Sequence, residues 1–445
     1  MSQHAFSHSF ATLQQLARDA LLYAQNAGAS AAEVDVSEGF GRAITVRRGS
    51  VETVEYNHDK GLGVSVYLGQ RRGSASTSDF SAAALRETVA AALAIAHFTA
   101  EDDCAGLPDP ALLALEAEDL DLYHPWNLAT EEAIALAARC EAAAFAADAR
   151  IDNSEGATVY TQESRFVAAN SLGFMGGYPT SRHSIACSVI AGKEDAMQRD
   201  DWYTTQRNAQ GLEAAEAVGE RAARRAVARL GARKIATGSF PVLFEAPLAA
   251  GLLGHFVHAA SGGALYRKSS FLVNALGEQL FPDFFQLRER PRQPGALASA
   301  PFDDDGVRTQ ERDVVRNGVL EGYFLGVYSA RKLGLVTTGN AGGNHNLILE
   351  PGALDLPGLL REMRRGLFVT ELLGHGVNSV TGDYSRGAAG FWVEEGEIVH
   401  PVEEITIAGN LRDMFRNIRA IGRDLQIRGS RQTGSLLIDG MTIAG

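Results

Sequence analysis

The sequence predicts an α+β fold: an N-terminal α/β region with antiparallel meander sheets and flanking helices, followed by a strand-rich C-terminal domain. Three observations predict it. Apolar and polar residues alternate over residues 32–76, as in half-buried strands. Helical periodicity flanks these strands, at 9–26 and 81–96. After residue 302, short strand-like runs are separated by turn signals, of which Asn317-Gly318 is the strongest.

The N-terminal part is predicted to form a helix, a meander and a second helix. The apolar stripe of residues 9–26 ends before Gly28, a suitable C-cap. Four glycines punctuate the following strand-like runs: Gly41, Gly49, Gly61 and Gly69. They predict short antiparallel strands joined by hairpins. Asp79 and Ser81 provide caps for the second helix, which continues to about Ala96.

The middle of the chain begins with a prolyl, acidic stretch at 102–127, which predicts a linker. The T-E-E pattern that starts at Thr130 is typical of a helix N-terminus. Strands are expected over about 157–189. A helix is then expected over 212–230, and its last turns are basic, as the helix dipole favours.

The C-terminal part starts with an apolar run at 240–245, which predicts a buried strand, and a helix at 247–258. Hairpin turns are expected at Asn317-Gly318, Glu395-Gly396 and Asp439-Gly440. The sequence has no repeat of solenoid period. These segments divide the chain into three predicted domains: 1–105, 106–236 and 237–445.

The composition favours a cytoplasmic protein that binds neither nucleic acid nor membranes. The chain has 445 residues and a net charge of −13, whereas nucleic-acid binders carry basic patches. Its three cysteines are too few and too scattered for a disulfide framework. The first ten residues lack the layout of a signal peptide, and no apolar run reaches the roughly 18 residues that a membrane span requires.

The stretch 252–259, L-L-G-H-F-V-H-A, is similar to a metalloprotease helix that has lost its metal. Zinc helices of the H-E-x-x-H kind need two imidazoles one turn apart and a carboxylate that takes a proton from the metal-bound water. His255 and His258 lie three residues apart, roughly on one helix face. No acidic residue lies between them, so the general base of such a site is missing.

Three longer stretches carry a resemblance to a known family. They are G-R-A-I-T-V-R-R-G-S-V-E-T-V-E-Y at 41–56, A-S-G-G-A-L-Y-R-K-S-S-F-L at 260–272, and G-V-N-S-V-T-G-D-Y-S-R-G-A-A-G-F-W-V-E-E-G-E-I at 376–398. Read in order, they resemble the TldD/PmbA family, and specifically its PmbA (TldE) branch. The resemblance covers nearly the whole chain.

The resemblance implies a heterodimeric metalloprotease that digests unfolded peptides in an enclosed chamber. Only the TldD-type chain of such a pair carries the zinc site, an H-E-x-x-x-H helix completed by a cysteine near the C-terminus. In this sequence Gly254 and Ala259 occupy the two histidine positions and His255 the glutamate position. Residues 428–436 contain no cysteine. All four functional positions therefore depart from the protease pattern.

Other candidate residues have simpler explanations beside the functional ones. Residues 303–305, D-D-D, are a possible source of a third ligand for His255 and His258, but such a run is more often a solvated turn. Because zinc requires three protein ligands, packing or hydrogen bonding near a subunit interface is favoured for the two histidines. The glycine- and asparagine-rich loop of His345 is suited to binding a peptide or an anion, yet turn chemistry alone explains it.

The segment from His375 to Asp383 is similar, and its glycines, including Gly382, would let another chain's backbone approach closely. The candidates for contact with a peptide or a partner are therefore His255, His258, His345, His375, Gly382 and Asp383.

The resulting hypothesis is a non-catalytic subunit that stabilises a TldD-like partner, forms chamber wall and holds unfolded peptide. The zinc would belong to that partner, and no cofactor is expected in this chain. Two alternatives remain: a metallopeptidase in its own right that uses His255 and His258, and a homodimeric peptide-binding protein without proteolytic activity. Roles that the family suggests are maturation of peptide antibiotics, degradation of small antitoxin-like proteins and modulation of DNA gyrase.

Overall fold

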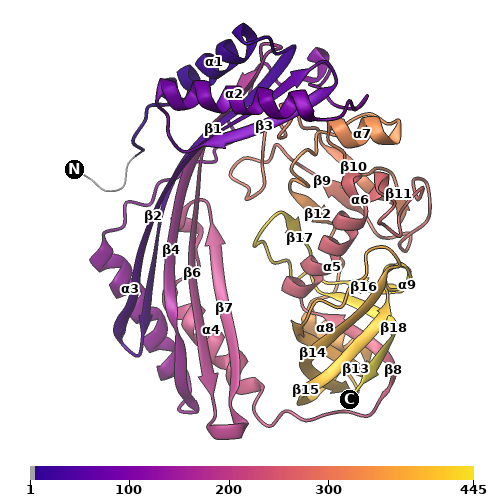
Figure 1. Cartoon of the computed structure of the whole chain (residues 1–445). Coiled ribbons are helices and arrows are strands. Elements are labelled where there is room, and N and C mark those ends of the chain that lie inside the picture. Colours follow the sequence, from indigo (N-terminus) through magenta and orange to yellow (C-terminus); the bar gives the residue numbers. More distant parts are fainter. Residues whose placement is uncertain (1–5) are drawn as a thin grey trace.

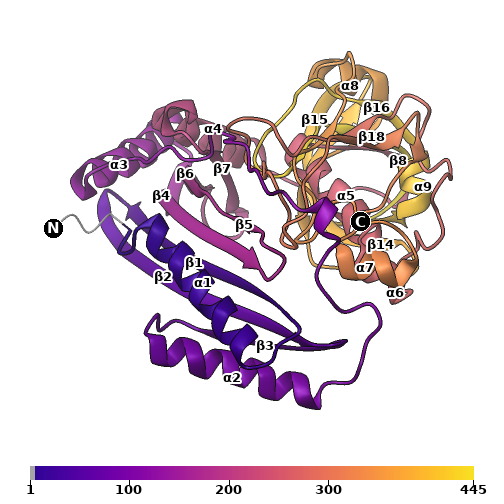
Figure 2. The ribbon, with the colours of Figure 1, turned by 90° about the horizontal axis from the view of Figure 1, so that it is seen from above.

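The computed structural model describes residues 6–445. The first five residues, which begin the predicted domain 1–105 and the segment that lacks a signal-peptide layout, lie outside the described residues. The chain forms an N-terminal lobe built on one long sheet and a C-terminal lobe built on two further sheets, which lie side by side in both views (Figure 1 and Figure 2). The predicted α+β class with strand-rich C-terminal part is confirmed.

The long sheet of the N-terminal lobe has the strand order β3-β2-β1-β4-β6-β7, with β5 paired to β4. Its strands are β1 (Ala31–Arg47), β2 (Ser50–Leu68), β3 (Arg71–Thr77), β4 (Ile151–Asn170), β5 (Met175–Gly176), β6 (Pro179–Ala191) and β7 (Gln198–Gln206). Because β1 pairs with β4 over almost its whole length, one sheet spans the regions predicted as domains 1–105 and 106–236. The three-domain division itself stays a prediction.

The predicted meander is antiparallel, as expected, but its strands are long rather than short. Turns occur at Gly49 and Gly69, whereas β1 continues through Gly41 and β2 through Gly61. A Cβ on Gly41 would collide with the Gln162 side chain and lie 2.8 Å from the Thr161 carbonyl oxygen of β4. This glycine therefore serves the close approach of a neighbouring strand, and the expectation of a turn there was wrong.

Four helices pack on one face of this sheet, with α1 and α2 at one end and α3 and α4 at the other (Figure 1). Their bounds are α1 (Phe10–Asn26), α2 (Ala82–Phe98), α3 (Thr130–Ala147) and α4 (Ala215–Ala228). On β1, Val36 packs under the first pair and Ile44 under the second. Since side chains alternate along a strand, Asp35 and Ser37 lie on the opposite face, where both are exposed.

The helices are those predicted, and local chemistry explains their starts. The hydroxyl oxygen of Ser9 accepts from the amide of Thr12, and that of Ser81 from the amide of Ala84. Gly28, which follows α1, has a φ of +92°, a conformation that glycine adopts without steric cost.

The C-terminal lobe contains two sheets, one with the order β11-β10-β9-β12-β17 and one with the order β15-β14-β13-β8-β18-β16. The first comprises β9 (Leu287–Glu289), β10 (Arg312–Arg316), β11 (Val319–Leu320), β12 (Leu347–Leu349) and β17 (Arg431–Gln432). The second comprises β8 (Gly238–Phe244), β13 (Gly366–Leu373), β14 (Asp383–Glu394), β15 (Glu397–Asn410), β16 (Ile418–Ile421) and β18 (Leu436–Ala444). Because β15 also pairs with β18, this sheet closes on itself.

The helices of this lobe are α5 (Ala246–Ala259), α6 (Gly262–Tyr266), α7 (Val327–Leu333), α8 (Leu356–Met363) and α9 (Leu411–Arg416). Helix α5 packs into the main core of the lobe, where Phe256 contacts the rings of Phe281 and Phe415 edge-on. No helix within residues 6–445 is long and apolar enough to cross a membrane.

Two of the three predicted hairpins of this lobe are confirmed. Asn317-Gly318 joins β10 to β11 and Glu395-Gly396 joins β14 to β15, and all four residues have positive φ. The third prediction was wrong, because Asp439-Gly440 lies inside β18. The register against β8 shifts between Ile438 and Met441, so Gly440, with φ +74°, forms a bulge instead of a turn.

Charged side chains hold the two lobes together. Arg225 of α4 donates to Asp200 of β7 at 2.9 Å and, through both terminal nitrogens, to Glu245 at the start of α5 (2.6 and 3.1 Å). The guanidinium of Arg428, from the loop before β17, lies 3.8 Å from the ring centroid of Trp202 on β7. These contacts set α5 and β17 on the side of the C-terminal lobe that faces the long sheet (Figure 1).

A test of the helix packing uses two helical glycines. In Gly219→Ala the new methyl group would collide with the carbonyl oxygen of Cys140 on α3, because the two helices touch there. We expect the free energy of unfolding to fall by about 1–3 kcal/mol, as in other overpacked cores. The control is Gly251→Ala on α5, where nothing lies within 4 Å of the added carbon. That variant should be neutral or more stable by up to about 1 kcal/mol. Urea unfolding measures both, and equal losses would contradict this packing.

Candidate functional site

One face of helix α5 is accessible to solvent and consists of two glycines and two histidines. Gly251, Gly254, His255 and His258 follow the i, i+3, i+4, i+7 spacing of a single stripe. His258 is exposed and His255 half-buried, while the opposite side of the helix is buried in the core. The two histidines that the sequence singled out are thus on one face, as expected, and that face is not part of the core.

The guanidinium of Arg431 occupies the space beside Gly254. Its Nη1 atom would lie 2.7 Å from a Cβ at that position, so any side chain there would displace it. Arg431 is the first residue of β17, the short strand next to α5. Burial lowers the pKa of this guanidinium below its ordinary value.

Strand β14 adds Tyr384 and Arg386, which lie two residues apart and so project from the same face. The Tyr384 ring contacts the ring of His255 edge-on, with centroids 6.0 Å apart. The Tyr384 hydroxyl is buried and has no hydrogen-bond partner among the described residues. Burial raises the pKa of Tyr384 to about 12. Burial, then the charges of Arg386, His258 and Arg431, lower the pKa of His255.

These residues do not fit a zinc ion. Gly254 offers no donor atom, and the side chain that fills the space beside it is a cation. Within residues 6–445, no three His, Cys, Asp or Glu side chains are grouped as metal ligands would be. The donor set at α5 is limited to His255 and His258, one ligand fewer than even an open zinc site uses.

The run 303–305 forms a turn, but the expectation that it is solvated was wrong for Asp303. That side chain is 3% exposed and accepts from the backbone amides of Asp305, Val307 and Ala341 at 2.9–3.0 Å. Burial, and then the charge of Asp305, raise the pKa of Asp303 to about 7. Its carboxylate therefore organises the turn instead of reaching toward α5.

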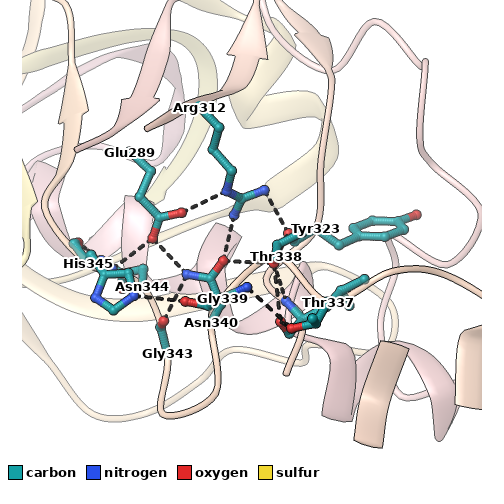
Figure 3. Close-up of polar contacts among 11 residues, drawn as sticks. Glu289, Arg312, Tyr323, Thr337, Thr338, Gly339, Asn340, Gly343, Asn344 and His345 are labelled. Carbon is teal, nitrogen blue, oxygen red and sulfur yellow. Dashed lines mark hydrogen bonds and ion pairs between the residues drawn. The ribbon is translucent and has the colours of Figure 1, made fainter. Parts of the chain in front are cut away.

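His345 belongs to a second region, built on a buried ion pair (Figure 3). Arg312 Nε lies 2.8 Å from the Glu289 carboxylate, which is almost fully buried. The same carboxylate accepts from the backbone amide of His345 and from the side-chain amide of Asn340, both at 2.8 Å. The His345 ring is held in turn by the carbonyl oxygen of Gly339, 2.9 Å from Nε2.

This network fixes the glycine- and asparagine-rich loop at the edge of a cavity between the lobes. The cavity has a volume of about 590 Å³. The long sheet contributes Asp35 and Phe166 to its wall, the residue after β7 contributes Arg207, and the C-terminal lobe contributes Asp304 and His345. The loop therefore both turns a corner, as turn chemistry explained, and lines a space large enough for a few residues of peptide. Peptide contact by His345 stays a prediction.

The segment of His375, Gly382 and Asp383 folds back on the start of β14. The amide of Gly382 donates to the carbonyl oxygen of Asn378 at 2.8 Å, and Gly382 adopts a φ of +84°. The carboxylate of Asp383 accepts from Thr381 and Asn410, which lowers its pKa. His375 is exposed beside this turn. The segment thus adjoins Tyr384 and lies near α5, whereas His345 lies in the other region.

Sequence reasoning did not single out Arg431, Arg386, Tyr384, Glu289 or Arg312. A local signal does mark Tyr384 and Arg386, because residues two apart on a strand project from the same face. No local signal marks Arg431 or the pair of Glu289 and Arg312, since their partners lie far along the chain.

Comparison with known proteins shows similarity to one family along nearly the whole chain. The chain matches the models of the PmbA/TldA metallopeptidase domain 1 over residues 32–96, of the central domain over 123–230 and of the C-terminal domain over 237–445. It is 49% identical over 434 residues to a metalloprotease PmbA homolog of Haemophilus influenzae, covering 97% of this chain and 96% of that protein. It is 50% identical over 414 residues to metalloprotease PmbA of Escherichia coli O157:H7, covering 93% and 92%.

Solved structures share the fold over almost the full length. A protein from Bacteroides thetaiotaomicron superposes with a TM-score of 0.92 at 28% identity, covering 97% of this chain and 98% of that one. TldE from Thermococcus kodakarensis superposes with a TM-score of 0.84 at 19% identity, covering 98% and 100%. The second likeness is one of fold alone.

A first prediction concerns the buried ion pair. Glu289→Gln leaves the Arg312 charge buried and unpaired, so we expect a loss of about 3–5 kcal/mol in the free energy of unfolding. Faster hydrogen exchange at the His345 amide should accompany it, because that amide donates to Glu289. The control is Glu350→Gln, which breaks a half-exposed pair with Arg288 (2.7 Å) and should cost no more than about 1 kcal/mol. Similar losses in both variants would contradict the role of Glu289.

A second prediction concerns Asp303, whose pKa in the folded protein is raised to about 7 from 3.8. Between these values the folded state binds more protons than the unfolded state, so stability falls as pH rises. The contribution of this carboxyl is complete below about pH 4 and lost above about pH 7. Asp303→Asn should remove this part of the pH dependence, measured by urea unfolding between pH 4 and 8. The exposed Asp195→Asn is the control and should keep the wild-type slope, and an unchanged slope in Asp303→Asn would reject the assignment.

Proposed function

Because the chain belongs to the PmbA/TldD metallopeptidase family, we propose that it is the non-catalytic subunit of a zinc metalloprotease that degrades or processes unfolded peptides. The single observation that carries the proposal is the α5 face. At the positions that the resemblance assigns to zinc ligands, the chain has Gly254 and Ala259, and Arg431 fills the space beside Gly254. A site with that arrangement repels a metal cation.

In this proposal the zinc and the hydrolysis belong to a TldD-like partner, and this chain contributes binding surface. The cavity beside His345 lies between the helix-free face of the long sheet and the C-terminal lobe, and α5 lies on the side of that lobe that faces the sheet (Figure 1). Strand β7 ends the order of the long sheet and offers an edge that could take an extended peptide as an added strand. The chain would thus form chamber wall, hold peptide and stabilise the active partner.

The same surfaces would serve a homodimeric peptide-binding protein, so the partner is the point that an experiment must decide. A metallopeptidase that uses His255 and His258 alone is disfavoured by the cations around them. We propose that the protein acts in the cytoplasm. Cys140 and Cys187 are buried thiols that form no disulfide, which suits a reducing compartment.

The test begins with the purified chain alone, without chelator. We expect zinc near zero per chain by elemental analysis and no cleavage of an unfolded, fluorescently labelled peptide. Mixing it with a TldD-type chain that carries the complete H-E-x-x-x-H helix should yield a complex of both chains by size-exclusion chromatography. That complex should cleave the peptide at least tenfold faster than the TldD-type chain alone.

Two results would contradict the proposal. Zinc near one per chain, lost in the His255→Ala/His258→Ala double variant together with cleavage, would make this chain a protease itself. Peptide binding by a dimer of this chain that forms no complex with the TldD-type chain would favour the homodimeric alternative.

A further inference from the structure

We propose that the exposed face of α5, together with Arg386, Arg431 and Tyr384, binds a carboxylate group of a peptide. The choice of a peptide rests on the proposed function, whereas the choice of a carboxylate rests on the contacts of this face.

The face carries positive charge without an acidic counterpart. Arg386 donates through Nε to the carbonyl oxygen of Leu373 at 3.2 Å, but neither Arg386 nor Arg431 forms an ion pair with any described residue. The guanidinium of Arg431 is half-buried between β17 and Gly254. Placing a cation in such a position is unfavourable unless an anion pairs with it, so the arrangement favours an anionic ligand.

The buried hydroxyl of Tyr384 also favours an anionic ligand. The Tyr384 hydroxyl has no partner among the described residues, and the residue is only 1% exposed. Leaving such a buried hydroxyl without an acceptor is unfavourable. A carboxylate oxygen would accept a hydrogen bond from this hydroxyl, while Arg386, on the same strand face, pairs with the negative charge.

The shape of the face admits a peptide backbone. Gly251 leaves the helix surface open, because nothing lies within 4 Å of a Cβ placed there, and one turn on the guanidinium of Arg431 fills the space beside Gly254. His258 extends the face at its other end and is exposed. An extended peptide can therefore approach the helix closely at Gly251 and place its carboxylate beside Arg431.

The charge of the whole chain favours a small carboxylate over a phosphate polymer. The chain carries a net charge of −13, which opposes a polyanion, whereas the positive charge of this face is local. Two planar guanidinium groups suit the two oxygens of a carboxylate. Such a group comes from the C-terminus of a peptide or from an Asp or Glu side chain.

The experiment measures peptide binding to the full chain alone, by isothermal titration calorimetry. The probes are acetyl-tetraalanine with a free C-terminal carboxylate, the same peptide as a C-terminal amide, and an amidated peptide with one internal glutamate. We expect the free acid to bind at least tenfold more tightly than the tetraalanine amide. Equal binding of the internal glutamate peptide and the free acid would identify any carboxylate as the ligand, and weaker binding would identify the C-terminus.

Variants locate the site. Arg431→Ala and Arg386→Ala should each weaken binding of the free acid at least tenfold, and Tyr384→Phe, which retains the ring, severalfold. The matched control is Arg416→Ala, which removes an exposed arginine of the same lobe and should leave binding unchanged. Circular dichroism verifies that each variant is folded.

Three results would overturn the carboxylate site: equal binding of acid and amide, an equal loss in Arg416→Ala, or no binding of the free acid at millimolar concentration. None of them involves zinc content, complex formation or cleavage, so the proposed function would be judged separately.

Discussion

The position of helix α5 relative to the long sheet depends on the ion pairs of Arg225. Its guanidinium bridges Asp200 of β7 and Glu245 at the start of α5 and is mostly buried, so the three charges must remain together. Arg229, the residue that follows α4, pairs with Glu371 of the C-terminal lobe and strengthens the same junction. These ion pairs therefore attach the N-terminal lobe to the C-terminal lobe beside the start of α5.

The two candidate regions differ in their charged residues. The cavity between the lobes is lined by Asp35, Asp303 and Asp304, and also by Arg207 and His345. The α5 face is lined by arginine and histidine. Carboxylates of the chain therefore line the cavity and not the α5 face, so an added carboxylate meets less repulsion at α5.

Local sequence signals predicted most elements and almost none of the contacts between them. Ser9 and Ser81 cap helices where the periodicity begins, and Asn317-Gly318 forms its hairpin, because each feature depends on neighbours in sequence. Gly41 and Gly440 were misassigned because a glycine marks a turn, a bulge or a close approach equally well, and only the neighbouring strand decides which. At the candidate site, His255 was recognisable from its helix. Arg431, which defines the chemistry there, lies on β17, far along the chain from α5, and no local sequence signal marks it.

The closed sheet of the C-terminal lobe also sets the order in which the protein can fold. Its strand β8 pairs on one side with β13 and on the other with β18, the last strand of the chain. During synthesis, the core around β8 and the apolar side of α5 therefore cannot be completed until β18 has been made. The N-terminal sheet has no such delay, because its last strand ends at Gln206. Folding on the ribosome would thus begin with a finished N-terminal lobe beside a long, apolar and unfinished segment, the kind of intermediate that chaperones protect from aggregation.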